Sequence, residues 1–312
     1  MAPSSAPTSA APDGIPPPPP PSSARPPPPV QSKHAAAAAA CLAARVSLVA
    51  TALAVFFWAY FLLGGVSWSP ERDPATGRVT STSKLFNWHP ILMSFAFLVC
   101  SGEAMLAYRS STPPPLLLAA AGPAPPTRSA RKAAHASLQA CALVIALLGS
   151  SAAWRSHALA DPPIPHLYSP HSWIGATTMT LFFAQAALGT AAFVFPGLKP
   201  PERRASFSPW HRLLGMCAFS AALVAIATGL QEKATFAQAF ARADVRGPIV
   251  RTAALAELGV LASAFCVGAA FFFSAAAAGG VGGGGGGGGG SGYGSLSGRE
   301  EEGLLPSRGG IE

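Results

Sequence analysis

The chain has 312 residues, of which 50% are hydrophobic and only 11% are charged, and its formal net charge is +8 at pH 7. This composition is too apolar for an ordinary soluble domain, and the charged residues gather between long apolar runs. It predicts an integral membrane protein. The excess of basic residues is explained by membrane topology, so a nucleic-acid partner is not expected.

Both ends of the chain have the composition of tails. Residues 1–40 are dominated by Pro, Ala and Ser, which favours an extended or disordered segment. Residues 279–312 begin with an almost uninterrupted glycine linker. Residues 41–278 lie between them and are expected to form one membrane domain. No secretory leader is expected, because the proline-rich segment stands where its charged region would be.

Six apolar runs are long enough to cross the hydrocarbon core as helices of about 17 to 25 residues. In chain order they occupy residues 41–66, 86–107, 133–154, 172–195, 210–230 and 252–275. The predicted fold class is therefore all-α, a six-helix transmembrane bundle. The five cysteines fall in or at the edges of these runs without paired spacing, which is typical of small buried side chains.

The distribution of Lys and Arg predicts the orientation. Basic residues are most frequent before the first span and in the loops after the second and fourth spans. The opposite loops mix basic with acidic residues. Because Lys and Arg accumulate in short cytosolic segments, the first group of segments is expected to be cytosolic. An even number of spans then places both termini in the cytosol.

Four histidines, His89, His135, His171 and His211, each stand near the N-terminal end of a different predicted span. Ionisable side chains are costly within a bilayer and usually serve a function there. Successive spans alternate in direction, so His89 and His171 should lie near one face of the membrane, and the other two near the opposite face. Facing helices of a bundle can supply axial histidines to haem iron. The pattern predicts two bis-histidine haem sites.

Glycine stands four residues after two of these histidines, as Gly175 after His171 and Gly215 after His211. Positions i and i+4 share a helix face, so each glycine leaves room for a flat porphyrin, although glycine also permits close helix packing. The alternatives are interfacial histidines, a proton- or metal-ion transporter that uses intramembrane His and Glu, and a membrane scaffold whose proline-rich tail recruits partners.

Short strings along the chain resemble one known family. They are Asn87-Trp88-His89-Pro90, Gly102-Glu103, Tyr108-Arg109, Lys132-Ala133-Ala134-His135, Tyr168-Ser169-Pro170-His171-Ser172-Trp173, His211 with Gly215, and Gly229-Leu230-Gln231-Glu232-Lys233. In this order they resemble the cytochrome b561 family. The resemblance implies a transmembrane reductase with two haem b groups between the four central helices, held by the four histidines. It also implies ascorbate as donor and a homodimer.

Ascorbate is an anion that loses a proton when it gives up an electron, so its site needs positive charge beside a haem. The resemblance assigns catalytic roles in the cytosolic ascorbate site to Arg109 and Lys132, and Arg131 lies beside Lys132. Lys132 stands three residues before His135 and so shares its helix face. These bases are also typical positive-inside anchors.

On the opposite side, Lys84 and His157 are the candidate acceptor-site residues, with His166 as a further loop histidine. The family carries a loop histidine before its Tyr-Ser-x-His motif, and His157 is the closer match. The expected acceptors are monodehydroascorbate or a ferric chelate. Glu103 follows His89 by fourteen residues, which puts both on one helix face and directs the carboxylate toward the cytosolic haem.

Together these patterns predict a transmembrane oxidoreductase that carries single electrons from cytosolic ascorbate through two b haems to an acceptor across the membrane.

The C-terminal segment contains a string that resembles an acidic dileucine sorting signal, Glu300-Glu301-Glu302-Gly303-Leu304-Leu305. It favours a vacuolar or other endomembrane location over the plasma membrane, although an exposed acidic tail with two incidental leucines has the same sequence.

Overall fold

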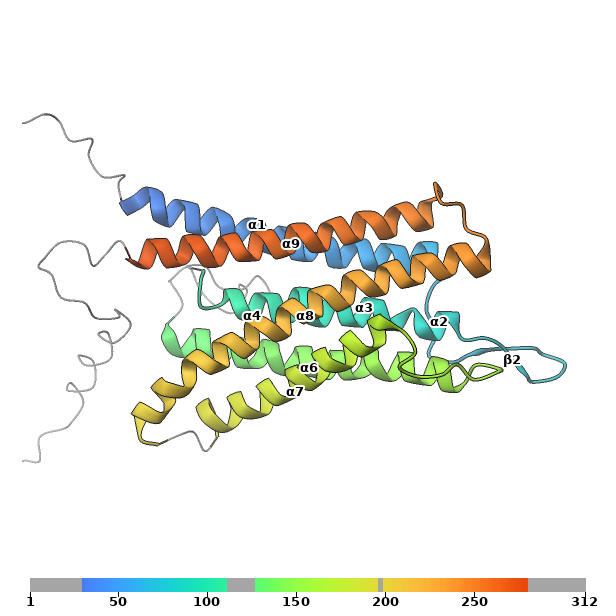
Figure 1. Cartoon of the computed structure of the whole chain (residues 1–312), viewed down its shortest axis with the longest axis horizontal. Helices are drawn as coiled ribbons and strands as arrows, with labels where there is room; N and C mark the ends of the chain where they lie inside the picture. Colours follow the sequence, from blue (N-terminus) through green and yellow to red (C-terminus); the bar gives the residue numbers. More distant parts are fainter. Residues whose placement is uncertain (1–29, 111–126, 196–198, 280–312) are drawn as a thin grey trace, which may run out of the picture.

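The computed structural model describes residues 30–110, 127–195 and 199–279. Within these residues, six helices are long and apolar enough to cross a membrane: Ser32–Leu62, Ser83–Leu106, Arg128–Ala158, Pro170–Phe193, Pro201–Phe240 and Pro248–Gly279. The predicted six-helix bundle is thus confirmed (Figure 1). The dileucine motif, the glycine run and most of both tails lie outside the described residues.

Two of these six spans are built from more than one helical element. The first consists of α1 (Val30–Phe57) and the π-helix η1 (Trp58–Leu62), and the second of α2 (Ser83–Phe86), α3 (Trp88–Ser94), the π-helix η2 (Phe95–Ser101) and α4 (Gly102–Leu106). The other four are the single helices α6 (Arg128–Ala158), α7 (Pro170–Phe193), α8 (Pro201–Ala241) and α9 (Pro248–Gly279). Between the first two spans, β1 (Glu71–Arg72) and β2 (Val79–Ser81) pair antiparallel.

Two helix boundaries differ clearly from the predicted spans. The first helix begins at Val30 and not at Cys41, because an alanine run over residues 35–40 favours helix strongly. Helix α8 has 41 residues, whereas the predicted span covers residues 210–230. A helix of that length extends about 60 Å, roughly twice the hydrocarbon thickness. Its two ends therefore continue beyond the apolar stretch that the sequence pattern detects.

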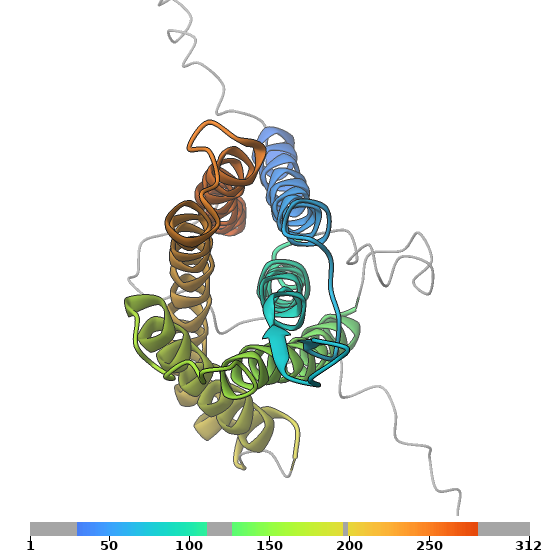
Figure 2. The same cartoon turned by 90° about the vertical axis from the view of Figure 1, so that its right-hand side faces the viewer.

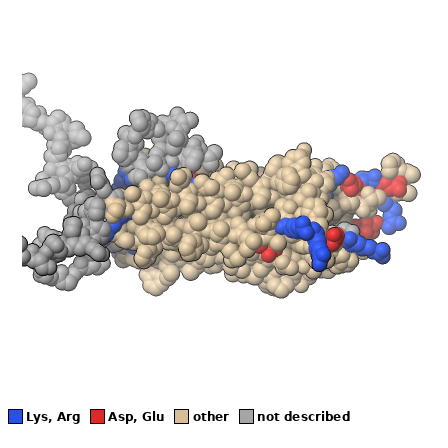
Figure 3. Space-filling view, turned by 90° about the horizontal axis from the view of Figure 1, so that it is seen from above, with Lys and Arg blue, Asp and Glu red and all other residues tan. Residues whose placement is uncertain are grey.

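The bundle has two distinct ends (Figure 1). At the tail end α1 begins and α9 ends, and the hairpin end carries β1 and β2. On the face shown in Figure 3, charged side chains lie mainly toward these two ends and leave a broad belt without charge between them. Such a belt is the surface that the hydrocarbon core of a bilayer requires.

The four central spans form two pairs of helices. Helix α7 packs along α8, and α3 with η2 packs along α6, whereas these two pairs meet each other only sparsely. Helices α1 and α9 pack together and lie next to the second span and α8 (Figure 2). Between the two pairs, the rings of Phe97 and Phe182 lie 5.1 Å apart within a cluster of buried apolar side chains.

Candidate functional site

At the hairpin end, the imidazole ring centres of His89 and His171 lie 6.0 Å apart. His89 is in the first turn of α3, and His171 is in the first turn of α7. Ser169 caps α7 and Pro170 occupies its first position. A proline is favourable at the first position of a helix, so Pro170 is compatible with the helical start that positions His171.

At the tail end, the ring centres of His135 on α6 and His211 on α8 lie 6.3 Å apart. Two aromatic rings flank His211, since Phe193 and Phe207 lie 5.1 and 6.4 Å from it between ring centres. The structure thus brings the four histidines together in the two pairs that alternating topology predicts. The pairs lie at opposite ends of the bundle.

Three of the four imidazoles donate a hydrogen bond from Nδ1 to a backbone carbonyl. The pairs are His89 with Gly149 at 3.0 Å, His135 with Ala104 at 2.8 Å, and His171 with Ala225 at 3.0 Å. Because a carbonyl oxygen only accepts, Nδ1 carries the proton and Nε2 keeps its lone pair for a metal ion. His211 differs, because its Nδ1 has no partner among the residues that the structure describes.

The spacing within each pair fits an iron atom between the two rings. A histidine nitrogen lies about 2 Å from the metal it binds, and the ring centre lies roughly 1 Å further, so two axial ligands hold their ring centres roughly 6 Å apart. The observed separations are 6.0 and 6.3 Å. Each histidine pair also takes one member from each of the two sparsely joined helix pairs. These residues therefore fit haem, a flat group ligated from both sides.

Two glycines pack directly against histidine rings. A Cβ atom added at Gly229 would lie 2.7 Å from the His171 ring, and one at Gly189 would lie 2.8 Å from the His211 ring. Real Cβ atoms do not approach this closely, so any larger residue here would displace the imidazole. Glycine at these two positions keeps His171 and His211 in the orientation that brings each toward its partner.

The two glycines chosen from sequence spacing have different surroundings. A Cβ at Gly175 would meet no described atom within 4 Å, so the room expected for a flat cofactor is present one turn from His171. At Gly215 an added Cβ would lie 3.0 Å from the Gln185 side chain. That side chain donates a hydrogen bond to the backbone carbonyl of His211. Gly215 therefore makes room for a residue that holds the backbone of α8 at His211.

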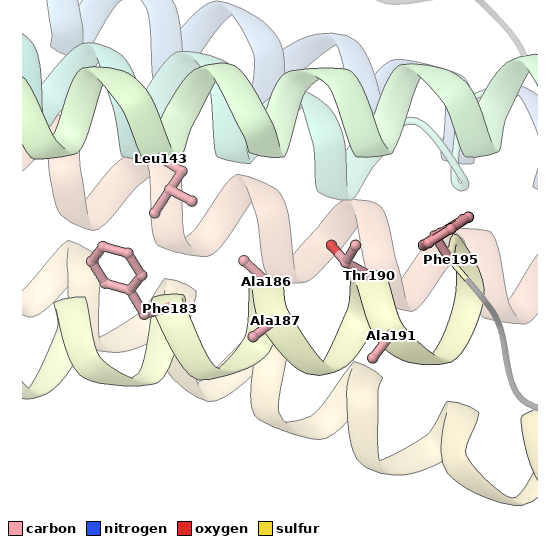
Figure 4. Close-up of a pocket in the computed structure, with 7 residues that line it drawn as sticks. All are labelled: Leu143, Phe183, Ala186, Ala187, Thr190, Ala191 and Phe195. Carbon is pink, nitrogen blue, oxygen red and sulfur yellow. The ribbon is translucent and has the colours of Figure 1, made fainter.

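An apolar hollow of 390 Å³ opens along the stretch of α7 that contains Gly189 (Figure 4). Figure 4 shows Leu143 of α6 facing small side chains of α7, with Phe183 and Phe195 at the two ends. The other lining residues are Ala186, Ala187, Thr190 and Ala191. Most of the α7 residues that line this hollow are small, and the hollow is open at the surface of the bundle.

Several buried polar atoms near the histidines have no hydrogen-bond partner within the described part of the chain. They are Trp88 Nε1, Arg131 Nε, Gln139 Oε1 and Gln185 Oε1. Trp88 precedes His89, and Arg131 and Gln139 lie one turn before and one turn after His135. Buried polar atoms are normally paired, so the unpaired Arg131 donor one turn from His135 favours a bound group that carries carboxylates, as haem does.

Of the residues predicted for the ascorbate site, Lys132 contacts a residue that packs on the tail-end pair. The Lys132 ammonium donates to the backbone carbonyl of Phe193, whose ring contacts His211. The ring of Tyr108 lies 5.6 Å from His135. Arg109 points elsewhere, since its guanidinium carbon lies 4.6 Å from the centre of the Phe271 ring on α9. Lys132 and Arg109 thus engage different helices.

Of the residues predicted for the acceptor site, His157 lies within an aromatic cluster at the hairpin end. Its ring is 6.3 Å from Phe86, and the Phe86 ring is 5.5 Å from His89. The His166 ring stacks 5.5 Å from His157. Lys84 is held at the edge of this end by an ion pair with Glu71 of β1, at 2.7 Å.

Sequence reasoning did not assign Phe86, Tyr168 and Lys233 to this cluster. The Lys233 ammonium lies 4.7 Å from the centre of the Phe86 ring. Tyr168 lies 6.0 Å from His157 and donates to Glu232, and burial followed by the Glu232 carboxylate raises the pKa of its phenol to about 12. Tyr168 and Lys233 stand within the strings that resemble the cytochrome b561 family. That resemblance is the feature of the sequence that could have assigned them to the site.

The structure corrects the expected direction of Glu103. Its carboxylate forms an ion pair with Arg45 of α1, at 3.1 Å, and so points to α1, away from the helix face of His89. The cause is η2, a π-helical stretch of seven residues that lies between His89 and Glu103. Its wider turns shift the helical phase, so spacing counted for an α-helix gives the wrong face.

Comparison with known proteins gives the same family on independent grounds. The model of eukaryotic cytochrome b561 matches residues 88–237. Transmembrane ascorbate ferrireductase 2 of Arabidopsis thaliana is 33% identical over 197 residues, which cover 63% of this chain and 75% of that protein. Ascorbate-specific transmembrane electron transporter 2 of Zea mays is 33% identical over 62% of this chain and 72% of its own length.

An animal protein is similarly related. The lysosomal membrane ascorbate-dependent ferrireductase of Mus musculus is 33% identical over 58% of this chain and 61% of its own length. The matched family segment begins at Trp88 and ends in α8, so it contains all four paired histidines. With the fold, the paired histidines and these relatives in agreement, the chain belongs to the eukaryotic cytochrome b561 family.

Proposed function

We propose that this protein is a transmembrane oxidoreductase that passes single electrons from cytosolic ascorbate to an acceptor on the other side of the membrane. The names of its relatives support ascorbate as donor and ferric iron as acceptor. The six spans support transfer across a membrane. The observation that carries the proposal is the presence of two histidine pairs at opposite ends of one bundle.

Membership of the family implies haem b, and the two histidine pairs support two haems. His89 and His171 would hold one through their Nε2 atoms, and His135 and His211 would hold the other. When bound, haem supplies reversible one-electron chemistry at its iron. The helices keep both sites in an apolar interior, and the backbone carbonyls fix the orientation of three imidazoles.

The proposed donor site lies at the tail end and consists of Lys132, Arg131 and Arg109. The Lys132 ammonium reaches the last turn of α7 beside His211, where it can attract the ascorbate anion and hold it by a charge-assisted hydrogen bond. Arg131 adds positive charge on the same helix. Ascorbate releases its proton to water at this end, which the positive-inside rule assigns to the cytosol together with both termini.

The proposed acceptor site lies at the hairpin end around His157. A neutral imidazole can ligate the iron of a ferric chelate, and the ammonium groups of Lys84 and Lys233 attract an anionic chelate or monodehydroascorbate. Phe86 lies between His157 and His89, which supports a short path from the hairpin-end histidine pair to the acceptor.

The domain limits, assembly and location stay proposals. We infer a membrane domain over residues 41–278, which α1 extends back to Val30, between tails that fall within residues 1–40 and 279–312. We also infer a homodimer by analogy with the family, and an endomembrane location. A lysosomal relative supports that location. Changing Leu304 and Leu305 to Ala in a tagged chain tests the sorting signal, because unchanged localisation of the variant would remove its role.

A transporter that uses intramembrane His and Glu is less well supported. Transporters commonly bind their substrate at broken helices near the middle of the membrane. Here α6, α7 and α8 each run as one continuous helix past their histidines. The histidines also lie in two pairs near the ends of the bundle, whereas a transport site lies at the midplane.

Vesicles that contain the purified full chain and are loaded with ascorbate test the proposal. An impermeant ferric chelate is added outside, and haem absorbance and ferrous iron are recorded together. We expect reduced haem and continuous iron reduction in loaded vesicles, and neither in vesicles without ascorbate. The proposal fails if loaded vesicles reduce external iron no faster than vesicles that lack the protein.

A further inference from the structure

A buried ion pair joins the first span to the second span near the tail end. Arg45 of α1 donates from Nε to Oε2 of Glu103 on α4 at 3.1 Å, and the two side chains are only 10% and 4% exposed. Burying two charges costs several kcal/mol per ion, which a single contact rarely recovers. A buried pair of this kind is therefore weak support for stability and calls for another role.

The residues on either side of Glu103 also make specific contacts. A Cβ added at Gly102 would lie 2.7 Å from the Leu48 side chain of α1, so glycine allows α1 to approach closely. The carbonyl of Ala104 accepts the Nδ1 hydrogen bond of His135 at 2.8 Å. Three consecutive residues thus join α1 on one side to a histidine on the other.

The position of this segment in the second span explains why it needs external support. It begins α4 directly after η2, where the hydrogen-bond pattern changes from π-helical to α-helical. π-Helical turns are rare interruptions of α-helices and are frequent at functional sites. Anchoring Glu103 to Arg45 fixes the segment at this junction, and with it the direction of the Ala104 carbonyl one residue away.

We propose that Arg45 and Glu103 are positioning residues that orient the His135 imidazole, and so set the properties of the tail-end haem alone, through the Ala104 carbonyl. This inference rests on the proposed ligation of haem by His135. It means that α1, which lies outside the matched family segment, influences the tail-end haem through Arg45. The hairpin-end pair lies at the opposite end of the bundle, and there the carbonyls that hold His89 and His171 belong to α6 and α8.

The test compares variants of the full chain that keep or remove the two charges. Glu103→Gln and Arg45→Met each leave one partner, whereas the double variant Arg45→Met with Glu103→Met removes both charges and retains an apolar contact. Arg45→Lys is the conservative variant. Thr51→Val is the matched control, because it removes another buried contact of α1, the 3.3 Å hydrogen bond to Ser263 of α9, that has no link to His135.

Three quantities are measured on purified protein: the midpoint potential of each haem by spectroelectrochemistry, the electron paramagnetic resonance signal of each ferric haem, and the rate of haem loss to an apoprotein acceptor. His135→Ala first identifies which signals belong to the tail-end haem. If His135→Ala leaves both haems in place, the proposed ligation fails, and this inference fails with it for a distinguishable reason.

We expect Glu103→Gln to raise the midpoint potential of the tail-end haem, because the unpaired positive charge of Arg45 favours the reduced haem. We expect Arg45→Met to lower this potential, because it leaves the negative charge of Glu103. Removing a group that orients a metal ligand commonly weakens metal binding by about 10-fold or more, so haem loss from this site should be about tenfold faster in the double variant. Arg45→Lys should restore the resonance signal of the parent protein.

The inference is overturned if both haems shift equally, if Thr51→Val reproduces the effect, or if the double variant retains the tail-end haem and its resonance signal unchanged. A single variant that fails to fold is replaced by the double variant, in which no buried charge is left unpaired.

Discussion

The two histidine pairs have nearly the same spacing but different support. At the hairpin end both imidazoles donate to backbone carbonyls, and both hydrogen bonds measure 3.0 Å. At the tail end only His135 has such a bond, while His211 lies among Phe193 and Phe207 without a partner for Nδ1 in the described residues. The similar spacing supports binding of one haem by each histidine pair. The unequal hydrogen bonding predicts that the two haems differ in midpoint potential.

The largest expected effect comes from removing a ligand. We expect His89→Ala and His171→Ala to empty the hairpin-end site, and His135→Ala and His211→Ala to empty the tail-end site, so that each variant retains about half of the haem. Resolved redox spectra of the four variants check the pairing. If His89→Ala and His171→Ala removed different spectral components, the pairing would be wrong.

A smaller effect should follow from filling the space beside a ligand. Gly229→Ala should disturb His171, and Gly189→Ala should disturb His211, because the added methyl lies 2.7 or 2.8 Å from the ring. Overpacking costs about 1 to 3 kcal/mol, so haem should be lost from the affected site about tenfold faster. Gly268→Ala on α9 is the control, since no atom lies within 4 Å of its added Cβ. Equal haem loss in all three variants would contradict the site-specific account.

The third prediction separates the two proposed donor-site bases. Lys132→Ala should lower kcat/KM for ascorbate by about 10-fold, because a hydrogen bond to a charged group contributes about 1.5 to 3 kcal/mol. Arg109→Ala should slow reduction less, since its guanidinium stacks on Phe271. Stopped-flow reduction at several ascorbate concentrations measures both, with haem content as the control. Unchanged kinetics in both variants would leave these bases only as membrane anchors.

The smallest effect is the difference in potential between the two sites of the unmodified protein. A hydrogen bond from Nδ1 makes an imidazole a stronger donor, which stabilises ferric iron. The hairpin-end haem, with two such bonds, should therefore have the lower midpoint potential. Potentiometric titration of the parent and of the single-site variants assigns each value, and the reverse order would show that another factor dominates.

Much of the fold and the pairing of the histidines follows from the sequence alone. Apolar runs locate the six spans because only helices satisfy their backbone inside a bilayer, and the alternation of those spans groups His89 with His171. The π-helical segments have no comparable signal. For that reason the sequence gives the wrong direction for Glu103 and no indication of its contact with Arg45.

The hydrogen-bond partners of the histidines show a second limit. The carbonyl that holds His89 belongs to Gly149, sixty residues further along the chain, and the one that holds His171 belongs to Ala225. Backbone carbonyls exist at every residue, so no residue type marks these acceptors. Spacing within one helix also gave no signal for Gly189 and Gly229, because their contacts with histidine rings come from neighbouring helices, although Gly229 stands in a string that resembles the family.

The number of haems per chain tests the central claim most directly. Pyridine haemochromogen absorbance gives the haem content of the purified full chain, and quantitative amino-acid analysis gives the amount of protein. The two histidine pairs predict two b-type haems for each chain, both reducible by ascorbate. A preparation that is folded and fully loaded yet holds one haem or none for each chain would contradict the account.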